Sequence, residues 1–252
     1  MTRSNRVEQL TTALQQREAE TTVADQRRPR TVAELPKISR ESLLAECRSG
    51  SVPTGQTIYR QGAAHTSSCI VMKGLVRTHY TAATGREITL AYWSEGDLIG
   101  GPNFLGGGYH IWNATAATPC RLLLIGDREL RQLAERDPEI LRWLTDTLSF
   151  KLKWLSILFQ IHGTESVRQR LAKLLAMLCE IYGEPDGAGI TIRHRISQGD
   201  LATLAGASRQ WTNRALGEFK REGLLEISKR RITVLDLERL SAISSEEAQL
   251  FV

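Results

Sequence analysis

The stretch from Ile196 to Leu225 constrains the fold of this chain more than any other. It predicts two helices joined by a tight turn, because Ser197 and Ser208 are residue types that cap helix N-termini and Gly223 stops the second helix. Gly206 stands between the helices, where glycine adopts a left-handed conformation at little cost. Small or apolar residues occupy the positions at which two such helices pack: Leu201, Ala202, Ala205, Ala207, Thr212 and Ala215. The stretch therefore predicts a helix-turn-helix.

The outward face of the second predicted helix is polar. It carries Arg209, Gln210, Asn213 and Arg214. Guanidinium and amide groups on one helical face reach base edges and phosphates in a major groove, and Ser197 and Ser208 at the two helix starts lie within reach of the same phosphates. The sequence thus predicts contact with double-stranded DNA. The alternative is an ordinary helical hairpin with a solvated polar face.

A predicted β-hairpin follows the two helices. Its strands are Glu226–Ser228 and Ile232–Leu235, and its tip carries Lys229 and Arg230, which suit phosphate contact. Residues 189–235 hold nine Lys or Arg and four Asp or Glu, so the net charge of this short region is +5, the same as that of the whole chain. That concentration of positive charge suits a polyanionic partner.

Short β-prone runs between turn signals fill most of the first half. A polar N-terminal extension covers residues 1–36, and a short helix over residues 41–48 leads into a domain over residues 37–136. The candidate strands are Gln56–Arg60, Cys69–Met72, Leu75–Tyr80, Arg86–Trp93, Ile111–Ala117 and Arg121–Ile125. Their near-regular spacing predicts an antiparallel β-barrel or jelly roll, and hence an α+β fold overall.

Residues 137–163 predict one long helix with two apolar stripes on opposite faces. One stripe follows the alternating spacing of a coiled-coil seam and includes Leu141, Leu148, Leu152, Leu155 and Phe159. We expect this stripe to form a homodimer interface while the other packs on the chain's own barrel. The alternative is a helix wholly buried inside a monomer. Residues 164–252 then form the domain that contains the helix-turn-helix and a short C-terminal tail.

The barrel is expected to enclose a small effector pocket. Its candidate lining residues are Tyr92, Trp93, Gly100, Gly101, Asn103, Phe104, Tyr109, Trp112, Asn113 and Ser156. From Leu98 to Gly126 the only strongly charged side chain is Arg121, and a buried phosphate without a cation would lose its hydration uncompensated. The sequence therefore favours a neutral or largely apolar effector. The alternative is that the aromatic residues fill the barrel and leave no pocket.

Cysteine usage and the lack of catalytic patterns exclude several classes. Cys47, Cys69, Cys120 and Cys179 form no CxxC pair and no Cys/His cluster, which argues against a zinc site, a cysteine-ligated iron–sulfur cluster and a disulfide framework. Reduced thiols are typical of a cytoplasmic protein, and no stretch resembles a signal peptide or a membrane span. With no convergent acid/base or metal set, the sequence predicts no enzyme, no metal and no cofactor.

The order of these parts, from Glu41 to Leu235, resembles the CRP/FNR superfamily of bacterial transcription regulators. The motifs that carry the resemblance are EGDLIG (Glu95–Gly100), DPEIL (Asp137–Leu141) and SRQWTNRALGEFKREGLL (Ser208–Leu225). The resemblance implies a homodimer on a two-fold operator, contact with RNA polymerase, and an effector in the barrel that alters how the recognition helices are presented. It also implies that Ser208, Arg209, Gln210 and Arg214 contact bases and phosphates.

The chain departs from the family pattern at several positions. Gly101 stands where members that bind cyclic AMP carry a glutamate, and residues 101–120 contain neither Arg nor Lys. No cysteine precedes Cys47, whereas oxygen-sensing members carry an N-terminal cysteine cluster. His79 and His110 are the histidines to weigh as haem ligands, and surface or structural roles are favoured. Two alternatives stay open: a regulator without a ligand, controlled by its own level or by oxidation, and a barrel enzyme or binding protein with a DNA-binding appendage.

Overall fold

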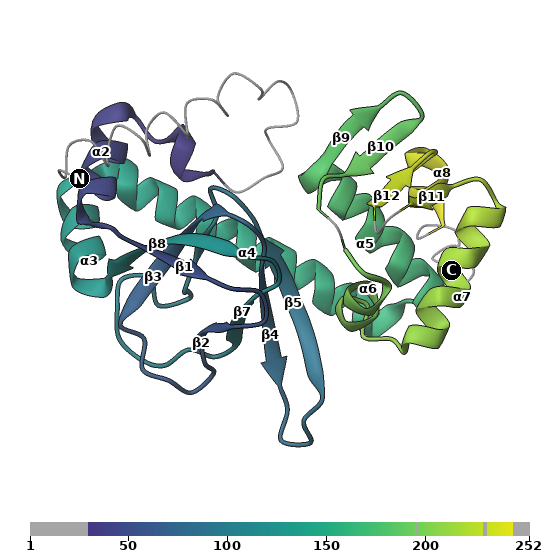
Figure 1. Cartoon of the computed structure of the whole chain (residues 1–252), viewed down its shortest axis with the longest axis horizontal. Coiled ribbons are helices and arrows are strands. Elements are labelled where there is room, and N and C mark those ends of the chain that lie inside the picture. The colour runs from purple at the N-terminus through teal and green to yellow at the C-terminus, as the bar shows by residue number, and fades with distance from the viewer. Residues whose placement is uncertain (1–29, 195, 229–230, 244–252) are drawn as a thin grey trace. The chain divides into compact units, whose positions relative to one another are not determined.

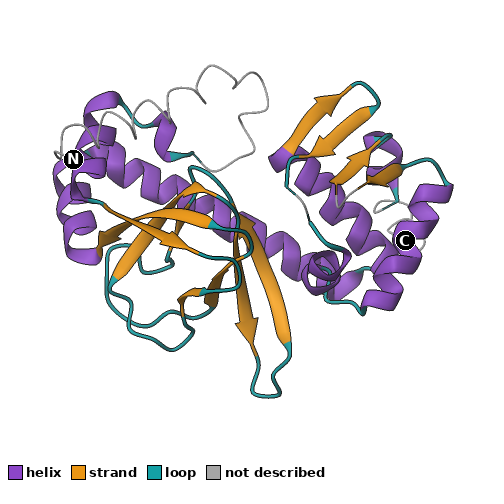
Figure 2. Cartoon of the chain, in the orientation of Figure 1, coloured by secondary structure: helices purple, strands orange, loops and turns teal. Residues whose placement is uncertain are grey.

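The computed structural model describes residues 30–194, 196–228 and 231–243. The chain divides into two compact units, the first ending at Lys153 and the second beginning at Trp154 (Figure 1). Strands and helices occur in both units, so the predicted α+β class is confirmed (Figure 2). Among the described helices, none is both long and apolar enough to span a bilayer.

Two four-stranded antiparallel sheets form the body of the first unit. The first sheet has the order β1 (Arg48–Val52), β8 (Cys120–Gly126), β3 (Ser67–Lys73) and β6 (Leu98–Ile99). The second has the order β2 (Thr57–Tyr59), β7 (Asn113–Ala116), β4 (Val76–Thr81) and β5 (Glu87–Trp93). All pairings are antiparallel, as the short strands and regular turns predict, and the jelly-roll architecture is confirmed.

Four helical segments accompany these sheets: η1 (Val32–Glu34), α2 (Lys37–Glu46), α3 (Asp127–Arg136) and the start of α4 (Pro138–Thr164). Their apolar side chains join Ile70, Leu98 and Leu123 in one core, whose largest fully buried side chain is that of Trp143. This core also takes in Val32, Ala33 and Leu35, and the Trp143 indole donates a 2.8 Å hydrogen bond to the carbonyl of Arg30. Residues 30–36 thus pack with the first unit, although the sequence reads as a polar extension; the rest of the predicted extension, residues 1–29, lies outside the described residues.

Three of the observed strands were not predicted from the sequence, and each omission has a physical reason. β1 is an edge strand with mostly exposed side chains, so its residues, RSGSV, lack the apolar alternation that marks a half-buried strand. β6 has only two residues. β9 (Gly183–Asp186) has the sequence GEPD, which carries no apolar alternation, and its Pro185 is compatible with its place at the edge of a sheet.

The second unit combines helices with a small four-stranded sheet. Its helices after α4 are α5 (Val167–Tyr182), α6 (Gln198–Leu204), α7 (Arg209–Arg221) and α8 (Leu237–Ala242). The sheet has the order β11 (Leu225–Ser228), β12 (Arg231–Val234), β10 (Gly189–Ile192) and β9. α6 and α7 are the predicted helix-turn-helix, and β11 and β12 are the predicted hairpin, so this part of the interpretation is confirmed.

The long helix α4 carries the two predicted stripes with contrasting exposure. Trp143 and Thr147 in the first unit, and Trp154 and Ile161 in the second, are buried. On the other stripe Leu141, Leu148, Leu152 and Phe159 are exposed, Leu152 to 68% and Phe159 to 83%, and Leu155 is half-buried. The alternative of a helix buried on all sides within one chain is therefore wrong.

Candidate nucleic-acid interface

Side chains at the helix starts fix the two helices of the helix-turn-helix. Ser197 Oγ accepts a hydrogen bond of 3.1 Å from the backbone N–H of Asp200, and the Asp200 carboxylate accepts one of 2.9 Å from the backbone N–H of Ser197. This reciprocal capping box satisfies two backbone donors at the start of α6. At the start of α7, Ser208 Oγ accepts from the backbone N–H of Trp211. Both capping predictions are confirmed.

The turn between the helices depends on glycine. Gly206 has φ of +61°, the left-handed region in which a side chain is strained. A Cβ there would lie 2.6 Å from Cε1 of His162, near the end of α4. The same imidazole contacts the Leu204 carbonyl, the last of α6, through Nε2 at 3.0 Å. Gly206 therefore allows both the turn and the close packing of His162 against it.

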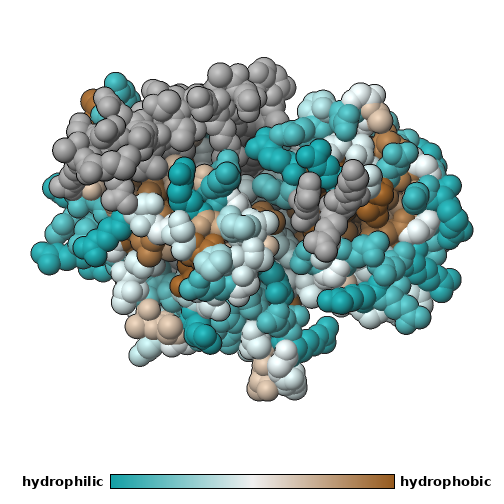
Figure 3. Space-filling view, viewed as in Figure 1, coloured by the Kyte–Doolittle hydropathy of each residue, from teal (hydrophilic) through white to brown (hydrophobic). Residues whose placement is uncertain are grey.

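The polar face of α7 is open to solvent. Thr212, Ala215, Leu216 and Phe219 turn inward and are buried. The opposite side presents the predicted residues Arg209, Gln210, Asn213 and Arg214, all of them exposed. In the space-filling view, hydrophilic residues cover much of the visible surface of the second unit (Figure 3).

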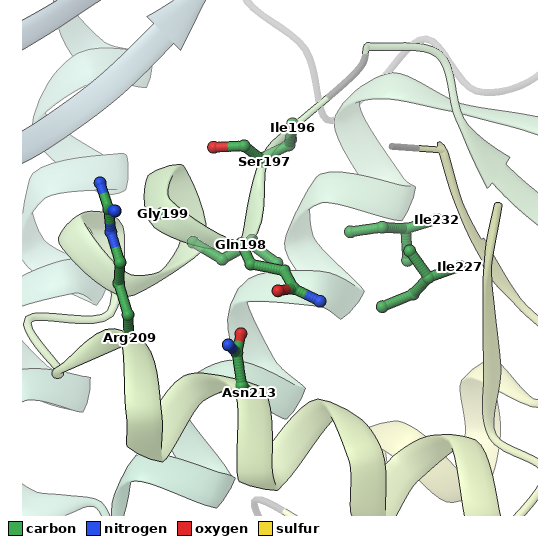
Figure 4. Close-up of a pocket in the computed structure, with 9 residues that line it drawn as sticks. Ile196, Ser197, Gln198, Gly199, Arg209, Asn213, Ile227 and Ile232 are labelled. Carbon is green, nitrogen blue, oxygen red and sulfur yellow. The ribbon is translucent and has the colours of Figure 1, made fainter. Parts of the chain in front are cut away.

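A hollow of about 550 Å³ opens between the start of α6, the face of α7 and the β11–β12 hairpin. Arg209 and Asn213 extend into it from α7, while Ile227 and Ile232 point into it from the hairpin (Figure 4). Gln198 and Gly199 also line it, and neither was predicted from the sequence. A Cβ on Gly199 would lie 3.2–3.4 Å from the Arg209 guanidinium, so Arg209 packs directly against the α6 backbone.

Arg214 lies on the other flank of α7 within a network of charges. Its Nε donates to Glu218 Oε1 at 3.3 Å, and its guanidinium carbon lies 5.5 Å from the centre of the Trp211 ring. Trp211 is 56% exposed and is not among the residues predicted from the sequence, although a tryptophan among polar residues is itself a signal. Glu218 also accepts from Arg168 of α5 at 3.3 Å.

The tip of the hairpin lies outside the described residues. Lys229 and Arg230, the predicted phosphate contacts, are the two residues concerned. The strands on either side are paired from Ser228 opposite Arg231 back to Leu225 opposite Val234. The hairpin is therefore formed up to the positions that flank its tip.

In the first unit, the predicted pocket residues lie in different environments. Tyr92, Trp93, Gly100, Gly101 and Phe104 are buried, and Asn103, Trp112 and Asn113 are half-buried. The Asn113 amide ties strands together, accepting from the Gln61 backbone N–H at 3.0 Å and donating to Thr81 Oγ1 at 3.1 Å. Tyr109 is 65% exposed, so it faces solvent and not an interior wall. Ser156 is exposed and belongs to the second unit.

Lys151 changes the electrostatic argument for the effector. Its Nζ lies 3.5 Å above the centre of the Trp93 ring and 5.7 Å from that of Phe104. The side chain is buried, and burial lowers the pKa of Lys151 to about 7 against the opposing effect of Asp97. The prediction that no cation accompanies the aromatic residues is therefore wrong. It counted charges only over Leu98–Gly126, whereas Lys151 comes from α4, which begins later in the chain.

A buried histidine holds the segment that starts at Gly100. His65 Nδ1 lies 2.9 Å from Asp127 Oδ2, and its Nε2 lies 2.8 Å from the Gly100 carbonyl oxygen. Both partners are acceptors, so both contacts are hydrogen bonds when the imidazole carries two protons. The His110 ring lies 4.5 Å from the His65 ring and stacks on Tyr59 at 4.0 Å. Burial, and then the neighbouring His65, lower the pKa of His110.

The two histidines weighed as haem ligands both have neighbours within the first unit. His79 contacts Glu87 through Nε2 at 3.4 Å, and His110 is engaged in the stack described above. Among the described residues, no three His, Cys, Asp or Glu side chains are grouped as metal ligands would be. The four cysteines are free thiols; Cys47 is half-buried and Cys69, Cys120 and Cys179 are buried.

The sequence matches two domain families in the order that the fold suggests. Residues 50–137 match the cyclic nucleotide-binding domain, and residues 169–243 match the Crp-like helix-turn-helix domain. The chain belongs to the CRP/FNR superfamily. Its relatives are transcription regulators, and this CRP/FNR protein is a regulator of that type.

Relatives of this CRP/FNR protein differ in the signal that their names state. It is 28% identical to the CRP-like cAMP-activated global transcriptional regulator of Mycobacterium tuberculosis, over 75% of this chain and 84% of that protein. It is 27% identical to the global nitrogen regulator of Synechococcus elongatus, over 79% of this chain and 94% of that protein. Family membership therefore does not decide the effector.

Solved structures share the fold. A CRP/FNR-family transcriptional regulator of Thermus thermophilus superposes with a TM-score of 0.63 at 25% identity, covering 79% of this chain and 98% of that one. FixK2 of Bradyrhizobium japonicum superposes with a TM-score of 0.71 at 21% identity, covering 78% and 96%. The second likeness concerns the fold alone.

Proposed function

We propose that this regulator is a homodimer that binds a two-fold DNA operator through α7, the start of α6 and the hairpin tip. The observation that carries the proposal is the exposed polar face of α7 beside the hollow of about 550 Å³. Arg209, Gln210, Asn213 and Arg214 supply base-edge donors and acceptors, and Ser197, Ser208, Lys229 and Arg230 meet phosphates. Two such helices in a dimer read half-sites about 34 Å apart.

Selection of bound sequences from random DNA tests this proposal. We expect a two-fold consensus, and Arg209→Ala weakens binding to it by about 1–3 kcal/mol. Changing Lys229 and Arg230 together weakens binding to all DNA sequences by a similar factor and makes the affinity less dependent on salt concentration. Recovery of no consensus would contradict sequence-specific binding, and an unchanged footprint for Arg209→Ala would remove α7 from the interface.

The proposed dimer interface is the exposed stripe of α4. Exposed leucines at coiled-coil spacing support association with a second copy, since a run of large apolar side chains is costly to leave in water. Leu152→Asp places a charge in that seam, so sedimentation at micromolar concentration should report monomers. Lys153→Asp, one residue further along the helix, is the matched control. A Leu152→Asp protein that stays fully dimeric would contradict the interface.

The proposed effector is an aromatic or alicyclic small molecule and not cyclic AMP. A Cβ on Gly101 would lie 2.8 Å from Phe104 Cζ, so the buried Phe104 ring fills the space that a glutamate would need for ribose recognition. A phosphate bound beside these aromatic residues would have to pair with Lys151. The Lys151 amine already lies against the Trp93 ring, and Asp97 is near it. Titration calorimetry with cyclic AMP and cyclic GMP is the direct test, and micromolar binding of either would contradict the proposal.

The other open functions have less support. Burial raises the pKa of Cys47, Cys69 and Cys179 to about 12, so these thiols hold little of the reactive thiolate that redox control requires. The relatives are transcription regulators, which favours a regulator over an enzyme with a DNA-binding appendage. A regulator that binds DNA without a ligand remains the second candidate, supported by the aromatic packing around Gly101.

A further inference from the structure

Glu218 joins two arginines on different helices. One carboxylate oxygen accepts from Arg214 Nε at 3.3 Å, and the other accepts from Arg168 Nη1 at 3.3 Å. Arg168 is itself held by Glu222, with bonds of 3.0 and 2.8 Å to the two carboxylate oxygens. Its guanidinium also lies 5.0 Å from the centre of the buried Phe219 ring. The four charged groups thus connect α5 to the DNA-facing side of α7.

The contact with Glu218 divides the donors of Arg214. Nε is engaged by the carboxylate, while the two terminal nitrogens have no acceptor among the described residues. Those two nitrogens form the fork that matches O6 and N7 of guanine. The Trp211 ring, 5.5 Å from the guanidinium carbon, restricts the side chain from the other side. The two contacts favour one orientation of the Arg214 side chain before DNA arrives, which lowers the entropy lost on binding.

We infer that Glu218 is a positioning residue that orients Arg214 to read one guanine in each half-site, with Arg168 and Glu222 keeping Glu218 in place. The inference rests on the proposed function, since it concerns the same DNA-binding face. Attraction to DNA gives no reason for an acid here, because a carboxylate on a DNA-facing helix repels phosphate. Arg168 is matched by Glu222, so the network adds no net positive charge to attract DNA.

The two roles of Glu218, charge and orientation, predict different results when it is changed. If Glu218 only repelled DNA, its removal would raise affinity for every sequence by the same factor. If it orients Arg214, its removal lowers the preference for guanine at one position of each half-site while affinity for random DNA is kept or raised. One bidentate base contact is worth about 5- to 150-fold in discrimination.

The test uses the full-length protein and the operator that wild type selects from random DNA. Binding is measured to that operator, to variants with each base pair replaced in turn, and to random DNA at two salt concentrations. Glu218→Ala should lose most of the guanine preference at one position, and Glu218→Gln less, because its amide oxygen still accepts from Nε. Glu222→Gln removes one acid from the same network without removing the contact between Glu218 and Arg214, so it should lose less of the preference than Glu218→Ala.

The outcomes separate this inference from the proposed function. Arg214→Ala and Glu218→Ala should lose preference at the same base pair, and the double variant should lose no more than Arg214→Ala. A wild-type consensus with unchanged base preferences in Glu218→Ala would overturn the inference and leave the DNA-binding function intact. If Glu218→Ala lost base preference at a base pair that Arg214→Ala does not affect, the inference would also be overturned. Melting temperatures of all variants identify any that are simply unfolded.

Discussion

Replacing Lys151 with methionine should make this protein more stable at neutral pH. The Lys151 side chain is 8% exposed, and burial lowers its pKa from 10.5 to about 7. That difference corresponds to about 5 kcal/mol of destabilisation when the lysine must be charged. The Trp93 face, 3.5 Å from Nζ, offsets part of the cost of desolvating the charged amine. Methionine keeps the unbranched apolar stem and carries no charge, so below pH 7 we expect a gain of up to about 5 kcal/mol.

The pH dependence gives the sharper signature. Between pH 7 and 10.5 the unfolded chain holds the Lys151 proton and the folded chain does not, so wild-type stability rises with pH through this window. The slope attributable to this one group is about 1.4 kcal/mol per pH unit. The methionine variant lacks that contribution, so its advantage should be full at pH 6 and shrink steadily toward pH 10.

Urea denaturation at pH 6, 7, 8 and 9 measures both effects, with protein concentration held fixed because a dimer's stability depends on it. Lys153→Met is the matched control, since Lys153 is exposed on the same helix and its loss should change little. Asp97 keeps its 2.6 Å bond from the Ser94 backbone N–H in the variant, so it is not left without a donor. Parallel pH profiles for wild type and Lys151→Met would refute the reasoning.

Three further predictions follow from single residues. Gln210→Glu should shift the base preference toward cytosine on the contacted strand, because a carboxylate accepts a hydrogen bond from cytosine N4 while an amide suits adenine. If wild type and the variant select identical DNA sequences, Gln210 reads no base. Gly217 lies in the interior of α7 with open space around its Cα, so Gly217→Ala should raise the free energy of unfolding in urea by about 0.5–1 kcal/mol, and a fall would contradict this. His65→Ala removes the imidazole that contacts both the Gly100 carbonyl and the Asp127 carboxylate, and should cost about 1–3 kcal/mol, measured by denaturation. Tyr80→Ala on the exposed hairpin should cost little.

Features set by near neighbours along the chain were predictable. The capping serines, the left-handed Gly206 and the stop at Gly223 each act within three or four residues, so the sequence alone specifies α6, the turn and α7. The two stripes of α4 follow from helical periodicity in the same way, and their opposite exposure is confirmed. Strands with an apolar side were found because burial imposes alternation, whereas the polar edge strand β1 carries no such pattern.

Tertiary structure decided which distant groups meet. Lys151 reaches Trp93 across 58 positions of the chain, and His65 reaches Asp127 across 62, so no local pattern connects them. Val32 and Leu35 pack in the core only because η1 lies against helices and strands formed much later. The Arg214–Glu218 pair is one helical turn apart and visible in the sequence, but Arg168 comes from α5. Local backbone preferences act over a few residues, whereas burial, pKa shifts and charge networks depend on neighbours that only the folded chain supplies.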